Sequence, residues 1–174
     1  TLNPMKHLDL MGSLMLLFIG FGYAKPVPVN PYKLNNPKAD MIKVAAAGPI
    51  SNLALGFLGT FIIYLLYSIN PYLLTNSTSL FLQIFIQINI FLAIFNLLPV
   101  YPLDGGQIFG NLLSDKYPDF NQNMQIYGPR VLMIVIFIGI FSGYSLIGMV
   151  LQPLYEIVNG LFNNIVKLLF MPFT

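Results

Sequence analysis

From Val44 to Leu103 the chain contains no Asp, Glu, Lys or Arg residue. Such a stretch is long enough for two apolar helices of about 20 residues, the length that crosses a lipid bilayer. Only 8% of the 174 residues are charged, whereas a soluble domain usually carries about 25% charged residues. The sequence therefore predicts an all-α polytopic membrane protein. We expect a bundle of three to five transmembrane helices that forms one domain over residues 1–174.

Uncharged apolar runs place the individual helices. Three of them have the length of a membrane span, at residues 44–69, 79–98 and 131–151. The first run carries small residues at helical spacing, which suits close packing between helices in lipid: Gly48, Asn52, Gly56 and Gly59. Residues 154–171 are also apolar but include Glu156 and Lys167. They are either a further span or a helix that lies at the membrane interface.

Residues 25–43 differ in composition from the rest. Prolines at 26, 28, 31 and 37 oppose a helix interior and favour an extended chain. The segment also holds four lysines against one acid, and residues 99–130 hold Lys116 and Arg130. Because cytoplasmic loops are enriched in Lys and Arg, we predict a cytoplasmic-side extended loop at 25–43, with 99–130 on the same side and the uncharged turn at 70–78 on the other.

Composition also excludes several kinds of function. The net charge of +2 gives no indication of nucleic-acid binding. The absence of cysteine excludes disulfides and thiolate metal sites. The only histidine is His7, and His7 with Asp104 alone cannot complete a catalytic zinc site, which needs three protein ligands.

The uncharged stretch ends at the sequence NLLPVYPLDGG, residues 96–106, where Asp104 stands between prolines and glycines. On chemistry alone three explanations are open. Asp104 could cap a short helix, with Gln107 completing a capping box. It could be an interfacial carboxylate that faces water. It could also be a functional carboxylate that binds a metal or moves protons, because an acid at membrane depth is costly.

Four blocks carry a resemblance to a known family: TLNPMKHLDLMGSLM, FGYAKPVPVNP, AAGPISN and NLLPVYPLDGG. In this order and spacing, over most of residues 1–130, the chain resembles the site-2 protease family of intramembrane zinc metallopeptidases. It is similar to the small bacterial and archaeal members without a PDZ domain. The resemblance implies a Zn²⁺ cofactor, a transmembrane protein as substrate, and a multi-pass location in a prokaryotic cell membrane. The lipid bilayer is the expected partner, and the oligomeric state is left open.

The resemblance also assigns roles to individual residues. Asp104 matches the aspartate that serves as the third zinc ligand. Asn96 matches a polar residue that helps to hold the substrate or the oxyanion, and Asn52 matches another asparagine near the site. The other two zinc ligands of the family come from an HExxH motif, which this sequence does not contain. We therefore expect an N-terminally truncated peptidase domain that is inactive as it stands, with the HExxH helix before Thr1.

The other polar residues have simpler explanations. We expect Gln83, Gln87 and Asn89 to form hydrogen bonds between helices, and packing alone would also explain Asn52. His7 and Asp9 are expected at the interface or near the site, without ligating zinc. The sequence PVPVNP is either a stiff loop or an exposed strand that holds an unwound substrate by β-augmentation.

Two other functions compete with the protease. A non-catalytic relative would bind membrane helices without cutting them and would carry no metal. A small ion or proton transporter would use Asp104 as its charged site, but no second acid lies between Val44 and Leu103 and no inverted repeat is visible.

Overall fold

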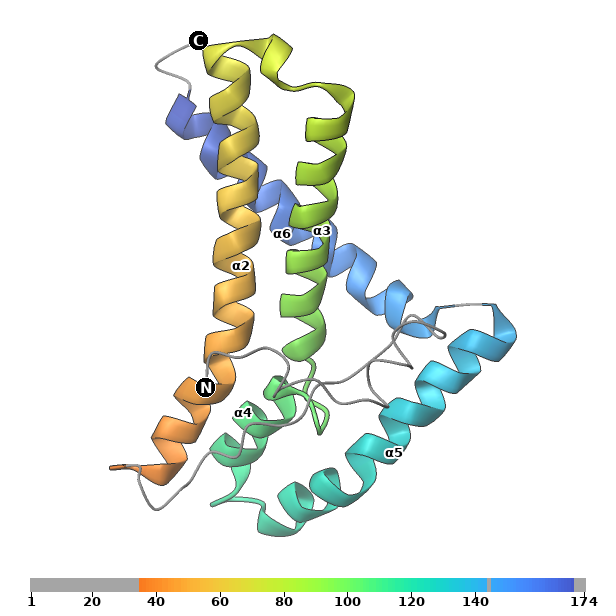
Figure 1. Cartoon of the computed structure of the whole chain (residues 1–174). Helices are drawn as coiled ribbons and strands as arrows, with labels where there is room; N and C mark the ends of the chain where they lie inside the picture. The colour runs from red at the N-terminus through yellow and green to blue at the C-terminus, as the bar shows by residue number, and fades with distance from the viewer. Residues whose placement is uncertain (1–34, 144, 171–174) are drawn as a thin grey trace, which may run out of the picture. The chain divides into compact units, whose positions relative to one another are not determined.

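A computed structural model describes residues 35–143 and 145–170 (Figure 1). In these ranges every regular element is a helix. The α-helices are α2 (Pro37–Ile69), α3 (Asn76–Asn96), α4 (Asp104–Leu113), α5 (Pro118–Ser142) and α6 (Leu146–Phe170), and the 3-10 helix η3 (Pro71–Leu73) joins α2 to α3. Three of the helices, α2, α3 and α5, are long and apolar enough to cross a membrane. The prediction of an all-α membrane protein is confirmed.

The start of α2 differs from the predicted extended loop at 25–43. Residues 37–43 are helical, and Pro37 is the first residue of the helix. Proline is tolerated there because the first helical residue needs no amide hydrogen for a bond within the helix. The remainder of that prediction, at residues 25–34, lies outside the described residues, and so does the proposed strand at PVPVNP.

The predicted span at 131–151 is wrong, because the chain turns within it. α5 ends at Ser142, and Gly143 follows in the left-handed conformation with a φ of 70°. Glycine adopts this conformation without steric cost and commonly ends helices. The segment predicted at 154–171 belongs to α6, which already begins at Leu146.

The hydrophobic core lies between α3 and α6. Ile86, Ile90 and Ile94 follow one another at the four-residue spacing that places side chains on one helix face, and they pack with Leu151 of α6. Aromatic pairs extend this core: the rings of Phe91 and Tyr155 stack at 4.9 Å between centroids. The ring of Phe57 on α2 meets Phe162 edge-on at 5.4 Å. α6 therefore holds both α2 and α3, and Figure 1 shows it crossing them obliquely.

The small residues of α2 face α3, as the sequence predicts. A Cβ atom built on Gly56 would lie 3.1 Å from Cγ1 of Ile90, and one on Gly59 would lie 2.8 Å from Cγ1 of Ile86. Both glycines are buried. Since lipid offers no hydrophobic drive between helices, close van der Waals contact of this kind is what holds two spans together.

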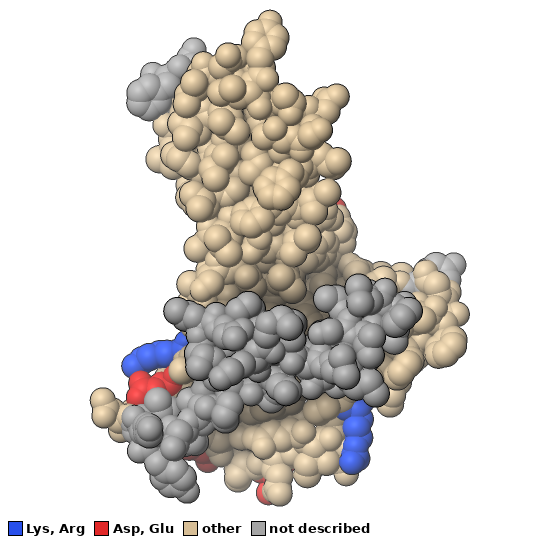
Figure 2. Space-filling view, viewed as in Figure 1, with Lys and Arg blue, Asp and Glu red and all other residues tan. Residues whose placement is uncertain are grey.

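The turn between α2 and α3 carries no charge and is closed by local hydrogen bonds. The Asn70 side chain accepts from the Tyr72 amide, and Thr75 caps α3 by accepting from the Thr78 amide. The Lys and Arg atoms visible in Figure 2 lie at the opposite end of the described helices. In α2 and α3 themselves the lysines lie only near the start of α2, so this pair has one apolar hairpin end and one charged end. Lys167 of α6 lies toward the hairpin end, since Phe170 packs on Phe61 and Tyr64.

The packing of α2 on α3 leads to a test with two matched helical glycines. Gly59→Ala places a methyl group 2.8 Å from Ile86, whereas Gly160→Ala on α6 meets nothing within 4 Å. Both changes gain about 1 kcal/mol of helix propensity, but overpacking at position 59 costs about 1–3 kcal/mol. We expect Gly59→Ala to lower the free energy of unfolding in mixed micelles titrated with SDS, and Gly160→Ala to leave it equal or higher. Equal effects of the two changes would contradict the close packing.

Candidate functional site

The site begins where α3 stops. Asn96 is the last residue of α3 and Leu97 is its C-cap, and Pro99 and Pro102 follow in the turn that leads to α4. Proline shortly after a helix prevents the helix from continuing. The turn is closed by its own backbone, with the amide of Leu103 donating to the carbonyl of Val100 at 3.0 Å. The two prolines thus follow the end of α3 and precede the start of α4.

Asp104 is not the helix cap. The N-cap of α4 is Leu103, whose backbone is extended (φ −68°, ψ 158°). The carbonyl of Leu103 accepts from the amide of Gln107 at 3.3 Å, and no side chain caps the helix. The predicted capping box is therefore wrong, because the helix begins one residue earlier than that motif requires. Asp104 is the first helical residue, and its side chain does not bind the amides of its own helix.

The carboxylate of Asp104 instead lies against α2. Oδ2 is 3.2 Å from the position that a Cβ atom would take on Gly48. Any side chain at position 48 would crowd the carboxylate, so glycine keeps this space open. Gly48 shares its helix face with Asn52, one turn further along α2. The structure thus brings a carboxylate from α4 next to the face of α2 that carries the predicted site asparagine.

The two asparagines lie near this carboxylate on their elements but do not bind it. Asn52 and Asn96 are both half-buried. Neither side chain forms a hydrogen bond with Asp104 or with any other residue among those described. Asn96 precedes the turn that leads to Asp104, and Asn52 lies one helical turn beyond Gly48. Both amides are therefore available to a third molecule.

Asp104 is half-buried, and the loss of water around it raises the pKa of its carboxyl above the ordinary value. The cause is that burial penalises the charged form. The carboxyl therefore takes up a proton at a higher pH than a solvated aspartate does. A cation beside it has the opposite effect, because a nearby positive charge favours the ionised form.

Gly105 and Gly106 make the position of Asp104 possible. A Cβ atom on Gly105 would lie 2.3 Å from the carbonyl oxygen of Leu97, and one on Gly106 would lie 2.5 Å from the amide nitrogen of Tyr101. These contacts involve backbone atoms, which cannot move aside as the end of a side chain can. The first turn of α4 is thus pressed directly onto the turn that ends α3.

Sequence reasoning missed the residues that hold this turn from its other side. Tyr101 lies between Gly110 of α4 and Gly128 of α5. A Cβ atom on Gly110 would lie 2.4 Å from the Tyr101 hydroxyl oxygen, and a Cβ atom on Gly128 would lie 2.9 Å from the Tyr101 carbonyl oxygen. The Tyr101 hydroxyl donates to Oδ1 of Asn121 at 3.4 Å. Glycine inside a helix costs stability relative to alanine, and this cost was the available signal that something packs closely at 110 and 128.

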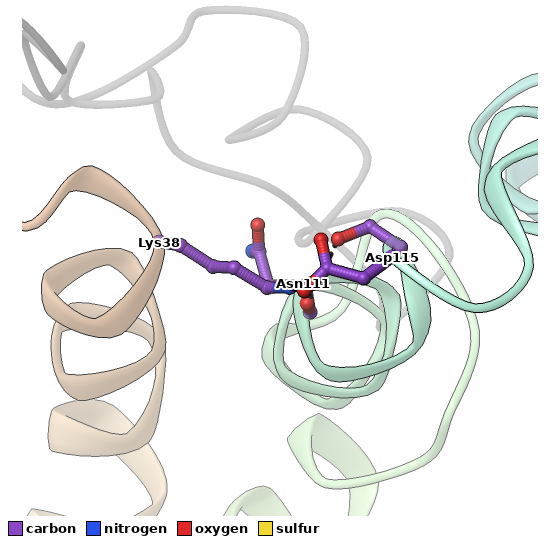
Figure 3. Close-up of polar contacts among 4 residues, drawn as sticks. Lys38, Asn111 and Asp115 are labelled. Atoms are coloured by element: carbon purple, nitrogen blue, oxygen red, sulfur yellow. Dashed lines mark hydrogen bonds and ion pairs between the residues drawn. The ribbon is translucent and has the colours of Figure 1, made fainter.

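An ion pair joins the start of α2 to the end of α4. Figure 3 shows Lys38 reaching from α2 toward Asp115, beside Asn111. The side chain of Asp115 is 86% exposed, so the pair contributes no more than about 1 kcal/mol. The ion pair shows that the charged start of α2 lies beside the end of α4.

The hydrogen bonds expected between helices are local instead. Nδ2 of Asn89 donates to the carbonyl of Phe85 at 2.8 Å, one turn earlier in α3. Nε2 of Gln83 donates to Oγ of Ser79 at 3.1 Å. For these two residues the prediction is wrong, because a donor one turn along the same helix already finds an acceptor there.

Within residues 35–143 and 145–170, no three His, Cys, Asp or Glu side chains come close enough to hold a metal ion. His7 and Asp9 lie outside the described residues. The half-buried carboxylate of Asp104 fits a single metal ligand, since carboxylate oxygen is one of the donor types that zinc accepts. A zinc site at this place needs further ligands in addition to the described residues.

The glycine contacts of the site lead to a second test. Gly105→Ala forces a methyl group onto the carbonyl oxygens of Leu97 and Leu98, whereas Gly48→Ala meets only one oxygen at the end of the Asp104 side chain. We expect Gly105→Ala to destabilise the protein by about 3 kcal/mol or to prevent folding, and Gly48→Ala to change stability by less than about 1 kcal/mol. The yield in detergent and the SDS-unfolding midpoint measure both, and a tolerated Gly105→Ala would refute the direct backbone contact.

Comparison with known proteins matches the part of the chain that contains the Asp104 turn. The model of Peptidase family M50 matches residues 70–139, which include α3, the turn and α4. "Putative zinc metalloprotease YwhC" of Bacillus subtilis is 39% identical over 149 residues, covering 84% of this chain and 68% of that protein. "Putative zinc metalloprotease MJ0611" of Methanocaldococcus jannaschii is 34% identical over 100 residues, covering 57% of this chain and 49% of that protein.

A second protein of Methanocaldococcus jannaschii, "Zinc metalloprotease MJ0392", is 34% identical over 87 residues, 47% of this chain and 22% of that protein. The chain thus spans about two-thirds of the Bacillus relative and half or less of the two archaeal ones. No solved structure matches it significantly. The identity and coverage shared with the Bacillus protein, together with the family match over the aspartate turn, show that this chain belongs to peptidase family M50, the site-2 protease family.

Proposed function

We propose that the chain is the substrate-facing part of an intramembrane zinc metalloprotease that hydrolyses peptide bonds of transmembrane proteins, with Asp104 as one of the zinc ligands. The observation that carries the proposal is the placement of the Asp104 carboxylate. It is half-buried, caps no helix, and lies against Gly48 of α2. The helix dipole favours an acid in this first turn, but no hydrogen bond or ion pair with a described residue compensates the partial burial of the carboxylate.

The remaining ligands belong, in this proposal, to a histidine pair of an HExxH motif elsewhere in the protein. Two histidines at i and i+4 share one helix face, so a third ligand has to come from another element, and the start of α4 supplies it. A bound zinc ion provides a nucleophilic water at neutral pH and polarises the scissile carbonyl.

The residues of this chain position the reactants. Asp104 offsets part of the cation's charge and is held rigidly by the glycine contacts of α4. Gly48 leaves the carboxylate accessible from α2. Asn96 and Asn52, whose amides bind no described residue, donate hydrogen bonds to the carbonyl groups of the unwound substrate. The substrate reaches them from the bilayer because α2 and α3 are membrane spans by length and composition.

The decisive experiment compares two aspartates in the full-length protein. We expect Asp104→Asn to abolish stoichiometric zinc, measured by mass spectrometry of the purified protein, and to abolish cleavage of tagged single-span proteins co-reconstituted in vesicles. Asp119→Asn makes the same change of charge in the first turn of α5 and is expected to retain both. Insertion into the membrane and the unfolding midpoint should be equal in the two variants.

Other outcomes identify the competing functions. A wild-type protein that binds membrane helices but carries no zinc and cuts nothing would be a non-catalytic relative. Proton flux through protein-containing vesicles that is lost in Asp104→Asn would indicate a transporter. Either result overturns the proposal.

Asn96 allows a separate test of substrate positioning. We expect Asn96→Ala to leave zinc content unchanged and to reduce kcat by about 100-fold, the effect of removing one donor to a developing oxyanion. Asn164→Ala on the exposed side of α6 is the matched control and should leave kcat unchanged. Full activity of Asn96→Ala would remove Asn96 from the proposed site.

A further inference from the structure

A second polar site lies between α2, α3 and α6, away from Asp104. It is a cavity of about 390 Å³, large compared with the roughly 30 Å³ that one water occupies in the liquid. Six polar side chains line it: Thr60, Gln83, Gln87, Tyr155, Asn159 and Asn163. None is an acid or a base that is charged at neutral pH, so the cavity suits a neutral ligand.

The hydrogen bonds around the cavity leave several polar groups unused. Thr60 donates to the carbonyl of Gly56, and Asn163 donates to the carbonyl and to Oδ1 of Asn159. By contrast, the amide of Gln87 and the hydroxyl of Tyr155 form no hydrogen bond with any residue among those described. The cavity thus offers both donors and acceptors, which is what an amide or hydroxyl ligand requires.

The cavity lies near the middle of α3, a helix long and apolar enough to cross a membrane. Gln87 is the twelfth residue of the 21 in α3, so it lies about 16 Å from the helix start, at a rise of 1.5 Å per residue. The hydrocarbon core is about 30 Å thick. An amide at this depth without a partner is costly, because lipid offers no hydrogen bonds. The Asn96 end of α3 is nine residues further on, roughly 13 Å away, so this site is distinct from the Asp104 site.

The surroundings of the cavity indicate how a ligand reaches it. Gln83 and Gln87 are exposed, so the cavity opens outward from α3. Leu80 and Ile84 lie three residues before them on the neighbouring helix surface and are 58% and 46% exposed. Polar groups surrounded by apolar side chains match an apolar helix that carries one polar residue, rather than a ligand that arrives from water.

We propose that this cavity binds the uncharged amide or hydroxyl side chain of a second membrane-spanning helix. The amides of α3 and α6 then gain the hydrogen bonds that lipid cannot supply, and the exposed leucine and isoleucine side chains pack against the apolar surface of the incoming helix. The site selects neutral hydrogen-bonding residues at the bilayer centre and lies apart from the residues proposed for hydrolysis.

The test measures binding in lipid vesicles and does not depend on zinc or cleavage. The full-length protein is labelled with a donor dye at Tyr72→Cys, in the exposed turn after α2. Residues 1–174 contain no other cysteine, and any cysteine elsewhere in the protein is replaced by serine. The probe is a polyleucine transmembrane peptide with one central asparagine and an acceptor dye. The matched peptide has leucine at that position, and a third peptide carries its asparagine near one end.

We expect energy transfer to show that the central asparagine tightens binding by about three- to twentyfold over leucine, the range of one or two hydrogen bonds between helices. Gln87→Leu and Asn159→Leu should each remove most of this preference. Asn164→Leu makes the same change on α6 outside the cavity and should retain it. The peptide with the terminal asparagine should bind no better than polyleucine.

The comparison of the two peptides on the wild-type protein needs no variant that might misfold. Its result is sufficient to overturn the proposal. Equal binding of the asparagine and leucine peptides would mean that the cavity holds water or is covered by another part of the same protein. An equal loss in Asn159→Leu and Asn164→Leu would mean that the effect is not specific to the cavity. Energy transfer between two labelled copies, lost in Asn159→Leu, would make the occupant a second copy of this chain and also refute the proposal.

Discussion

The direct contact of backbone with backbone between α4 and the turn at residues 97–103 is the constraint on which the site depends. Gly105 and Gly106 have no side chain to hold the two segments apart, so α4 starts immediately beside the end of α3. Asp104 precedes this contact by one residue and is fixed by it. With any larger residue at 105 the carboxylate would move away from α2, because the atoms opposite are carbonyl oxygens that cannot yield.

The small residues of α2 serve two purposes on one helix face. At Gly56 and Gly59 they allow isoleucines of α3 to approach, which is the dominant attraction available between helices in lipid. At Gly48, further toward the charged end of the helix, the same absence of a side chain leaves room for Asp104. The small residues of α2 thus pack it against α3 and leave room for the carboxylate nearer the charged end of α2.

Polar groups of two kinds occur at two depths. The acid lies at the end of the apolar run, where water and a metal can compensate its charge. The amides that line the cavity lie near the middle of α3 and α6, where only another hydrogen-bonding group can compensate them. This separation argues for two distinct interactions with membrane-embedded partners.

The sequence by itself determined the all-helical membrane class, because a chain without charge from Val44 to Leu103 cannot form a soluble domain. It also singled out Asp104 as a candidate site residue, because this carboxylate ends the uncharged run. Two other features depend on contacts between distant residues: the position of the Asp104 carboxylate against Gly48, and the close packing of Gly110 and Gly128 on Tyr101. The break at Gly143 is local, since a side chain there would meet nothing within 4 Å. Hydropathy alone does not show that a helix ends inside an apolar run. The spacing of residues along one helix does not show which carboxylate faces a neighbouring helix. Only the tertiary structure decided where the Asp104 carboxylate lies, because that follows from which segments pack against each other.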